Sequence, residues 1–196
     1  MIRITVPSAE GHDPFGYAAR SHAREIMAAA GDFSKAVYRH SSLSLREFEG
    51  ARSRTAEING CIVCQQFRAA RDAPAMFSAS GVRPDRIISD NGPAPDEAFY
   101  AAVSDWRHSS LFSPRERMAI EFAERFAEEP KVLADDEDFW VRAHALFSDG
   151  ELVDLAHSVA AWVGLGRVAH VLGFDSVCLP FAAAETEPAC SPVASI

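Results

Sequence analysis

Three serine-to-glutamate capping boxes divide this chain into helical segments. Each box precedes an apolar pattern with helical spacing, and the boxes lie at residues 44–47, 113–116 and 148–151. In such a box the serine side chain accepts a hydrogen bond from a free backbone N–H, and the glutamate bonds back to the serine N–H. The second box also has proline at the favoured first helical position. Because these starts introduce long helical patterns, the sequence predicts an all-α fold.

The first two helix starts share their serine, arginine and glutamate positions, as S-L-R-E and S-P-R-E. This similarity indicates a weak internal repeat of helical hairpins. We therefore expect a bundle of two related helical-hairpin halves, at about 18–80 and 96–173. Both halves would belong to one domain that spans residues 18–179.

The two ends of the chain differ from this helical part. Proline and glycine breakers predict an extended N-terminal arm over residues 1–17. An end rich in alanine and proline predicts a flexible C-terminal tail over residues 180–196. The start lacks a signal-peptide layout, and no apolar run approaches the roughly 20 residues of a membrane span. We therefore expect a cytoplasmic protein that binds no membrane.

The composition and the net charge further limit the classes of partner that the chain can bind. The 196 residues are 48% hydrophobic, which is ample for a core, and the net charge is −9. A protein that binds nucleic acid needs basic patches to neutralise phosphates. We expect no nucleic-acid partner.

Cys61 and Cys64 form the most concentrated chemical signal in the sequence. The preceding Asn59-Gly60 pair favours the end of a helix, because both residues tolerate the left-handed conformation. A new helix, expected from Cys61 to about Met76, would carry both cysteines in its first turn. Free N–H groups and the helix dipole stabilise a thiolate there. In a cytoplasmic protein such a pair favours catalysis or metal binding over a structural disulfide.

Metal binding has little support in the sequence. Cys178 and Cys190 are twelve residues apart near the C-terminus, and the seven histidines show no metal-ligand spacing. We therefore expect no metal and no bound cofactor. His157 and His170, in the last apolar helices, are the histidines to test for proximity to Cys64.

A helical hairpin would bring charged residues to the cysteines. Glu49 lies eleven residues before Gly60, and Arg68 lies eight residues after it. If the chain reverses at Gly60, both residues reach a similar depth at about 1.5 Å per residue, and Arg68 shares a helix face with Cys64. In an unbroken helix, Glu49 and Cys61 would be roughly 18 Å apart. On spacing alone, a solvated helix carboxylate is the favoured interpretation of Glu49.

The pattern resembles the alkylhydroperoxidase AhpD-like and carboxymuconolactone decarboxylase superfamily. Redox-active members carry a glutamate, then C-x-x-C after Asn-Gly, then a histidine four residues past the second cysteine. The positions that match are Glu49, Arg54, Asn59-Gly60, Cys61 and Cys64. Position 68 differs, because Arg68 stands where the family has its histidine. A softer similarity in the second half extends the resemblance to about residues 18–173.

The resemblance implies an AhpD-like helical bundle and a thiol-dependent peroxidase or disulfide reductase. Cys64 would attack a hydroperoxide, Cys61 would resolve the product to a disulfide, and Glu49 would be the distal end of a proton relay. An external dithiol protein would reduce the disulfide, and the chain would assemble as a trimer or hexamer. Arg68 cannot exchange a proton at ordinary pH. It would lower the thiol pKa by its charge or pair with Glu49, and a histidine elsewhere would supply the base.

Two other functions remain open from the sequence. One is a decarboxylase-like lyase without a redox role, in which Arg54 or Arg68 binds a substrate carboxylate. The other is a non-catalytic helical oligomer with a structural Glu49–Arg68 pair. Taken alone, Arg52 and Arg54 are expected to be surface charges or interface pairs.

Overall fold

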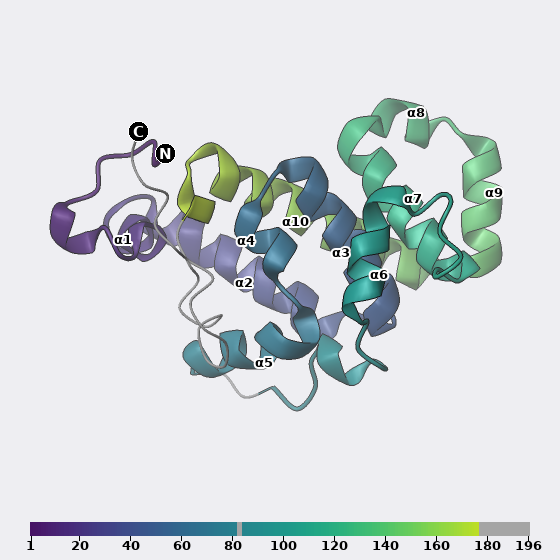
Figure 1. Ribbon diagram of the computed structural model, residues 1–196, viewed down its shortest axis with the longest axis horizontal. Coiled ribbons are helices and arrows are strands. Elements are labelled where there is room, and N and C mark those ends of the chain that lie inside the picture. The colour runs from purple at the N-terminus through teal and green to yellow at the C-terminus, as the bar shows by residue number, and fades with distance from the viewer. Residues whose placement is uncertain (82–83, 177–196) are drawn as a thin grey trace.

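The computed structural model describes residues 1–81 and 84–176, and it contains helices and no strand in these ranges (Figure 1). The α-helices are α1 (Pro14–Ser21), α2 (Arg24–His40), α3 (Leu45–Asn59), α4 (Ile62–Gln66), α5 (Ala69–Ala79), α6 (Glu97–Ala102), α7 (Pro114–Glu128), α8 (Pro130–Ala134), α9 (Glu137–Leu146) and α10 (Asp149–Val171). The short 3-10 helices are η1 (Ser8–Glu10), η2 (Ile88–Asp90), η3 (Val103–Asp105) and η4 (Phe174–Ser176). The expected all-α class is confirmed.

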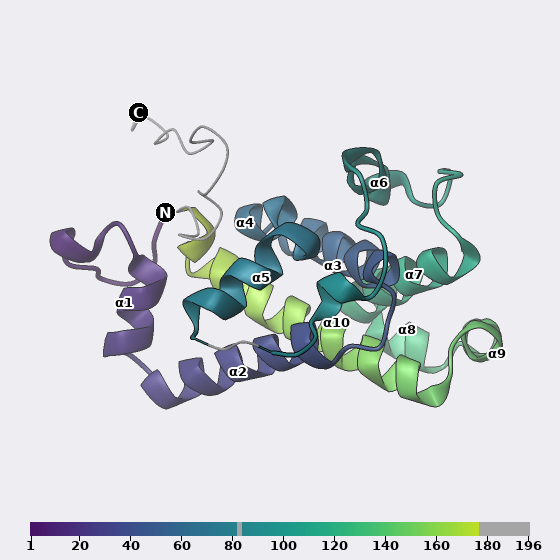
Figure 2. The same cartoon turned by 90° about the horizontal axis from the view of Figure 1, so that it is seen from below.

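The molecule is elongated, with α1 at one end and α8 and α9 at the other (Figure 1). The long helices α2, α3 and α10 run between these ends, as a second view confirms (Figure 2). The C-terminal end of α10 lies beside α4, which η4 also contacts. Helix η4 therefore connects the end of α10 to the short helix that follows α3.

Reciprocal ion pairs join the starts of α3 and α7. Arg46 of α3 donates to Glu116 of α7 at 2.5 Å, and Arg115 of α7 donates to Glu47 of α3 at 2.5 Å. Both glutamates also complete the capping boxes of their own helices, and the box at the start of α10 forms as well. The two similar sequence motifs therefore occupy equivalent places in the fold and exchange equivalent contacts.

The main core lies between α3 and the helices packed around it. Its fully buried large side chains include Phe48, Phe139, Leu43, Leu45, Leu155 and Val159. A smaller cluster gathers on the α6 side, around Phe99, Val103, Trp106, Phe112 and Ile120. Helix α3 is buried or half-buried along its whole length, contributes to the larger cluster and packs against both α7 and α10. This packing fixes the position of its C-terminal end.

The N-terminal segment is partly helical, which corrects the expectation of an extended arm over residues 1–17. Helix α1 begins at Pro14, because proline suits the first helical position and the Asp13 side chain accepts from Gly16 N at 2.8 Å. Before it, Arg3 N donates to Leu172 O at 3.0 Å, so the first residues lie on the end of α10. The tail expected over 180–196 lies outside the described residues. Cys190 within this tail and Cys178 just before it lie outside them as well.

By length and composition, α10 is the one helix within the described ranges that is apolar enough to cross a membrane. The sequence expectation concerned an uninterrupted apolar run, and Asp154, His157 and Arg167 interrupt the apolar residues of α10. Its face with Leu152, Leu155 and Val159 is buried in the core against α3. This face of α10 is therefore occupied by packing against the other helices.

Candidate functional site

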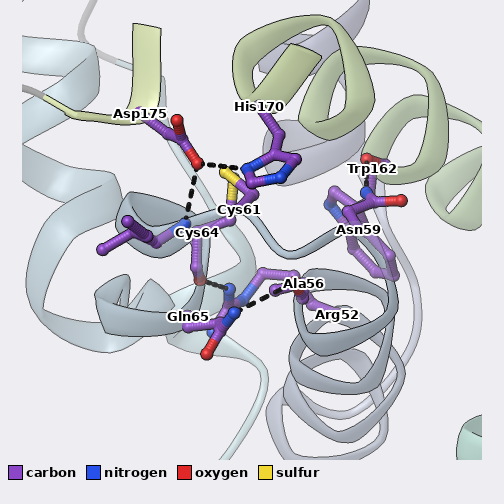
Figure 3. Close-up of a disulfide and its surroundings, with 10 residues drawn as sticks. Arg52, Ala56, Asn59, Cys61, Cys64, Gln65, Trp162, His170 and Asp175 are labelled. Carbon is purple, nitrogen blue, oxygen red and sulfur yellow. Dashed lines mark hydrogen bonds and ion pairs between the residues drawn. A yellow bond between two sulfur atoms is a disulfide. The ribbon is translucent and has the colours of Figure 1, made fainter. Parts of the chain in front are cut away.

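The two cysteines lie at the turn between α3 and α4, as the sequence predicts. Helix α3 ends at Asn59, and Gly60 follows in the left-handed conformation with φ 68°. Cys61 is the N-cap of α4, and its sulfur is bonded to that of Cys64 in a disulfide with a Cα–Cα distance of 5.2 Å. The Asn-Gly stop thus places both cysteines in one turn (Figure 3).

Asn59 anchors this turn to α10. Its side-chain nitrogen donates to Trp162 O at 2.9 Å, and its oxygen accepts from Arg167 Nε at 3.1 Å. A Cβ on Gly166 would lie 2.5 Å from the same amide nitrogen, so a glycine is needed for this close approach. The end of α3 is therefore held at a fixed height along α10.

The two sulfur-bearing residues differ in accessibility. Cys61 is fully buried, whereas Cys64 is partly exposed. A partly exposed thiol can meet a small substrate, and a buried neighbour in disulfide reach can then bond to it. The arrangement supports reversible dithiol–disulfide chemistry with unequal roles for the two cysteines.

Helix α4 is shorter than the sequence predicts. The expected helix from Cys61 to Met76 is interrupted at Phe67 and Arg68, which adopt extended conformations before α5 begins. The physical reason is Arg52, whose guanidinium donates to Cys64 O and to Phe67 O, each at 2.6 Å. These carbonyl groups are satisfied by a side chain of α3 instead of by a continuing helix.

Arg52 and Glu49 form a buried ion pair, which corrects the expectation of Arg52 as a surface charge and rules out the alternative of a solvated carboxylate at Glu49. Arg52 is 3% exposed and Glu49 is 0% exposed. Arg52 Nε lies 2.5 Å from Glu49 Oε1, and Nη2 lies 3.2 Å from Oε2. Burial alone would lower the pKa of Arg52, but the charge of Glu49 raises it above its usual value. The guanidinium therefore keeps its charge and neutralises the carboxylate.

Tyr100 of α6 completes the surroundings of Glu49. Its hydroxyl donates to Glu49 Oε2, and burial followed by the charge of Glu49 raises the pKa of this phenol. The hydroxyl therefore stays protonated and remains a donor. Both oxygens of Glu49 are thus engaged, one by Arg52 and the other by Arg52 and Tyr100.

Arg68 points toward α6, so the expected Glu49–Arg68 pair does not form. Its guanidinium donates to both carboxylate oxygens of Glu97 at 3.0 and 2.9 Å and lies 3.8 Å from the centre of the Tyr100 ring. This hydrogen bonding lowers the pKa of Glu97. The break at Phe67 is the cause, because it removes Arg68 from the helix face that carries Cys64.

Arg54 lies on the α7 side of α3. It donates to Glu124 Oε2 and Glu57 Oε2, each at 2.8 Å. A guanidinium already paired with two carboxylates on the chain is poorly placed to capture a substrate carboxylate. Arg54 therefore gives the lyase alternative no support.

His170 and Asp175 complete the site, and sequence reasoning missed Asp175. Figure 3 shows the His170 ring beside the disulfide, with Asp175 in contact with it. His157 does not share this position, because it precedes His170 by thirteen residues on α10, a separation of about 20 Å along the helix. Its Nδ1 lies 2.8 Å from Val153 O on an exposed face. Of the two histidines singled out, His170 is the one near the cysteines.

No group of three or more His, Cys, Asp or Glu side chains in residues 1–81 and 84–176 is arranged to hold a metal ion.

Gly60→Ala is expected to destabilise the fold by about 2–3 kcal/mol. The positive φ strains an alanine, and its Cβ would lie 3.2 Å from His170 Nε2. Gly81→Ala is the matched control, because Gly81 has φ 71° and nothing within 4 Å of an added Cβ. Its expected cost is about 1 kcal/mol. Urea unfolding of both variants measures the difference, and equal losses would show that His170 does not pack on Gly60.

Comparisons with known proteins support the fold. No protein-family model and no curated protein sequence matches the chain. A crystal structure from Agrobacterium tumefaciens matches with a TM-score of 0.57 and 21% identity, over 89% of this chain and 98% of that one. That protein is of unknown function and is described as a candidate antioxidant defence protein AhpD. The chain therefore has an AhpD-like all-α fold.

Proposed function

We propose that this protein is a thiol-dependent peroxidase or disulfide reductase of the AhpD-like kind. The observation that carries the proposal is the Cys61–Cys64 disulfide with one buried and one partly exposed cysteine. The accessible Cys64 is assigned as the thiol that attacks, and the buried Cys61 as the thiol that resolves. The likeness to a candidate antioxidant defence protein adds support.

The proposed reaction balances without a bound cofactor. The Cys64 thiolate attacks a hydroperoxide oxygen, so that an S–O bond forms, the O–O bond breaks and an alkoxide leaves to become an alcohol. The Cys61 sulfur then displaces hydroxide from the Cys64 sulfenic acid, which releases water and closes the disulfide. One hydroperoxide is reduced by two electrons as two thiols are oxidised. An external dithiol protein then reduces the disulfide by exchange through a mixed disulfide.

The buried ion pair of Arg52 and Glu49 is assigned the role of holding the cysteine turn in place. Arg52 fixes the carbonyl groups of Cys64 and Phe67, and Glu49 fixes Arg52. Glu49 is then an anchor whose oxygens are both engaged, in place of the proton relay that the resemblance implies. Arg68 holds α6 to the site through Glu97 and Tyr100.

The proposed partners are a small hydroperoxide, a dithiol reductant protein and further copies of the chain in a cytoplasmic trimer or hexamer. Several large apolar side chains are exposed and would suit contact between copies; they include Ile26, Val141, Val153 and Val171. Nucleic acid and membrane are not proposed as partners.

The test follows the thiols of the reduced protein after one equivalent of an organic hydroperoxide is added. Peptide mass spectrometry is expected to show rapid formation of the Cys61–Cys64 disulfide. Cys64→Ser should remove the fast reaction, whereas Cys61→Ser should retain the first step and accumulate a sulfenic acid that a trapping reagent captures. Oxidation no faster than that of free cysteine would refute the peroxidase assignment. Reaction retained in Cys64→Ser would overturn the assigned roles.

A further inference from the structure

Asp175 is a buried carboxylate that the reaction above does not use. It is 5% exposed, and its Oδ2 accepts from the backbone N–H of Ile62 at 3.1 Å. Ile62 lies between the two cysteines. The same oxygen lies 2.8 Å from Nδ1 of His170. One carboxylate oxygen thus ties the C-x-x-C turn to an imidazole from the end of α10 (Figure 3).

The contacts of His170 fix both the position and the tautomer of its ring. A carboxylate accepts and does not donate, so the short contact with Asp175 places the hydrogen on Nδ1. Nε2 is then the ring nitrogen that carries the lone pair. The ring packs on Gly60, where Nε2 would lie 3.2 Å from an added Cβ. Gly60 directly precedes Cys61, so the imidazole covers the start of the turn.

Solvent can still reach this ring. The side chain of His170 is 47% exposed, whereas Asp175 beneath it is 5% exposed. A buried carboxylate that orients a partly exposed imidazole is an arrangement suited to proton transfer at the surface of a site. Neither side chain belongs to the hydrophobic core cluster.

We propose that His170 is the acid–base group of the dithiol site and that Asp175 is the residue that positions it. The inference rests on the proposed function and supplies the proton carrier that Arg68 cannot be. The protons then balance within the site. His170 Nε2 takes the proton of the Cys64 thiol, directly or through one solvent molecule, and delivers it to the leaving alkoxide. It next takes the Cys61 proton and delivers it to the hydroxide that leaves as water.

His170→Gln tests the acid–base assignment, with His157→Gln as a matched control on the exposed face of the same helix. Stopped-flow measurement of disulfide formation with an organic hydroperoxide should show about a 100-fold lower rate constant for His170→Gln and an unchanged one for His157→Gln. The pH profile of the wild-type rate should contain an ionisation that His170→Gln lacks. Equal rates and profiles in wild type and His170→Gln would overturn the inference and leave the peroxidase proposal intact.

A second readout does not depend on peroxide. The rate at which iodoacetamide alkylates the reduced protein, measured against pH, reports the thiolate of Cys64. His170→Gln should move this titration to higher pH, and Asp175→Asn, which keeps an acceptor for Ile62 N–H, should move it part of the way. If wild type is inert to hydroperoxide, the proposed function fails, and this titration still decides whether His170 acts on Cys64. An unmoved titration in both variants would assign the two residues to structure alone.

Discussion

Replacing Arg52 by methionine is expected to lower the free energy of unfolding by about 3–5 kcal/mol. The substitution leaves Glu49 buried at 0% exposure with one neutral donor, the Tyr100 hydroxyl, in place of a bidentate cation. It also removes the donors to the carbonyl groups of Cys64 and Phe67. Chemical denaturation measures the loss.

A double-mutant cycle separates the buried charge from the lost carbonyl contacts. Glu49→Gln in the Arg52→Met background removes the uncompensated charge, so the double variant should be more stable than Arg52→Met alone. A double variant as unstable as the sum of the single variants would show that the pair does not couple.

Glu49→Gln by itself separates an anchor from a proton relay. A glutamine keeps an oxygen that accepts from Arg52 and from the Tyr100 hydroxyl. If Glu49 is only an anchor, the rate of the thiol reaction with hydroperoxide in Glu49→Gln should therefore stay within about tenfold of the wild-type rate. Loss of a general acid–base group typically costs a factor of about 10²–10⁴. A loss of that size, in a variant whose fold is intact, would restore the relay role to Glu49.

The local signals in the sequence were sufficient for the helix starts and for the cysteine turn. The side chains of Ser44, Ser113 and Ser148 cap backbone N–H groups three residues ahead of them. Gly60 ends α3 through its own left-handed backbone. Such features depend on short-range stereochemistry, so spacing in the sequence reports them directly. The all-α class and the position of the disulfide follow from these residues.

The parts of the site that spacing did not predict depend on contacts between distant segments. Arg52 meets Cys64 O twelve residues away, and Asp175 meets Ile62 N across 113 residues. Nothing local distinguishes Arg52 from Arg54, yet one is buried behind α4 and the other faces α7. The break at Phe67 follows from the first of these contacts, and the orientation of Arg68 follows from the break.

Phe48→Ala is expected to destabilise the fold by about 3–5 kcal/mol, because Phe48 is fully buried where three helices meet. Its ring centre lies 5.2 Å from that of Tyr38 on α2 and 4.7 Å from that of Trp162 on α10. Phe33→Ala is the matched control, since Phe33 is 41% exposed on α2 and its truncation leaves no closed cavity. Denaturant unfolding compares the two variants.

The same substitution connects core packing to the site. Trp162 packs on Phe48 and also accepts, through its carbonyl oxygen, the Asn59 side chain at the start of the cysteine turn. A cavity at Phe48 should therefore loosen the contact between α3 and α10 that sets the height of His170 over Gly60. Hydrogen exchange of backbone amides near the C-terminal ends of both helices should increase in Phe48→Ala and stay unchanged in Phe33→Ala. Destabilisation of the two variants by the same amount would place the packing centre of these helices elsewhere than at Phe48.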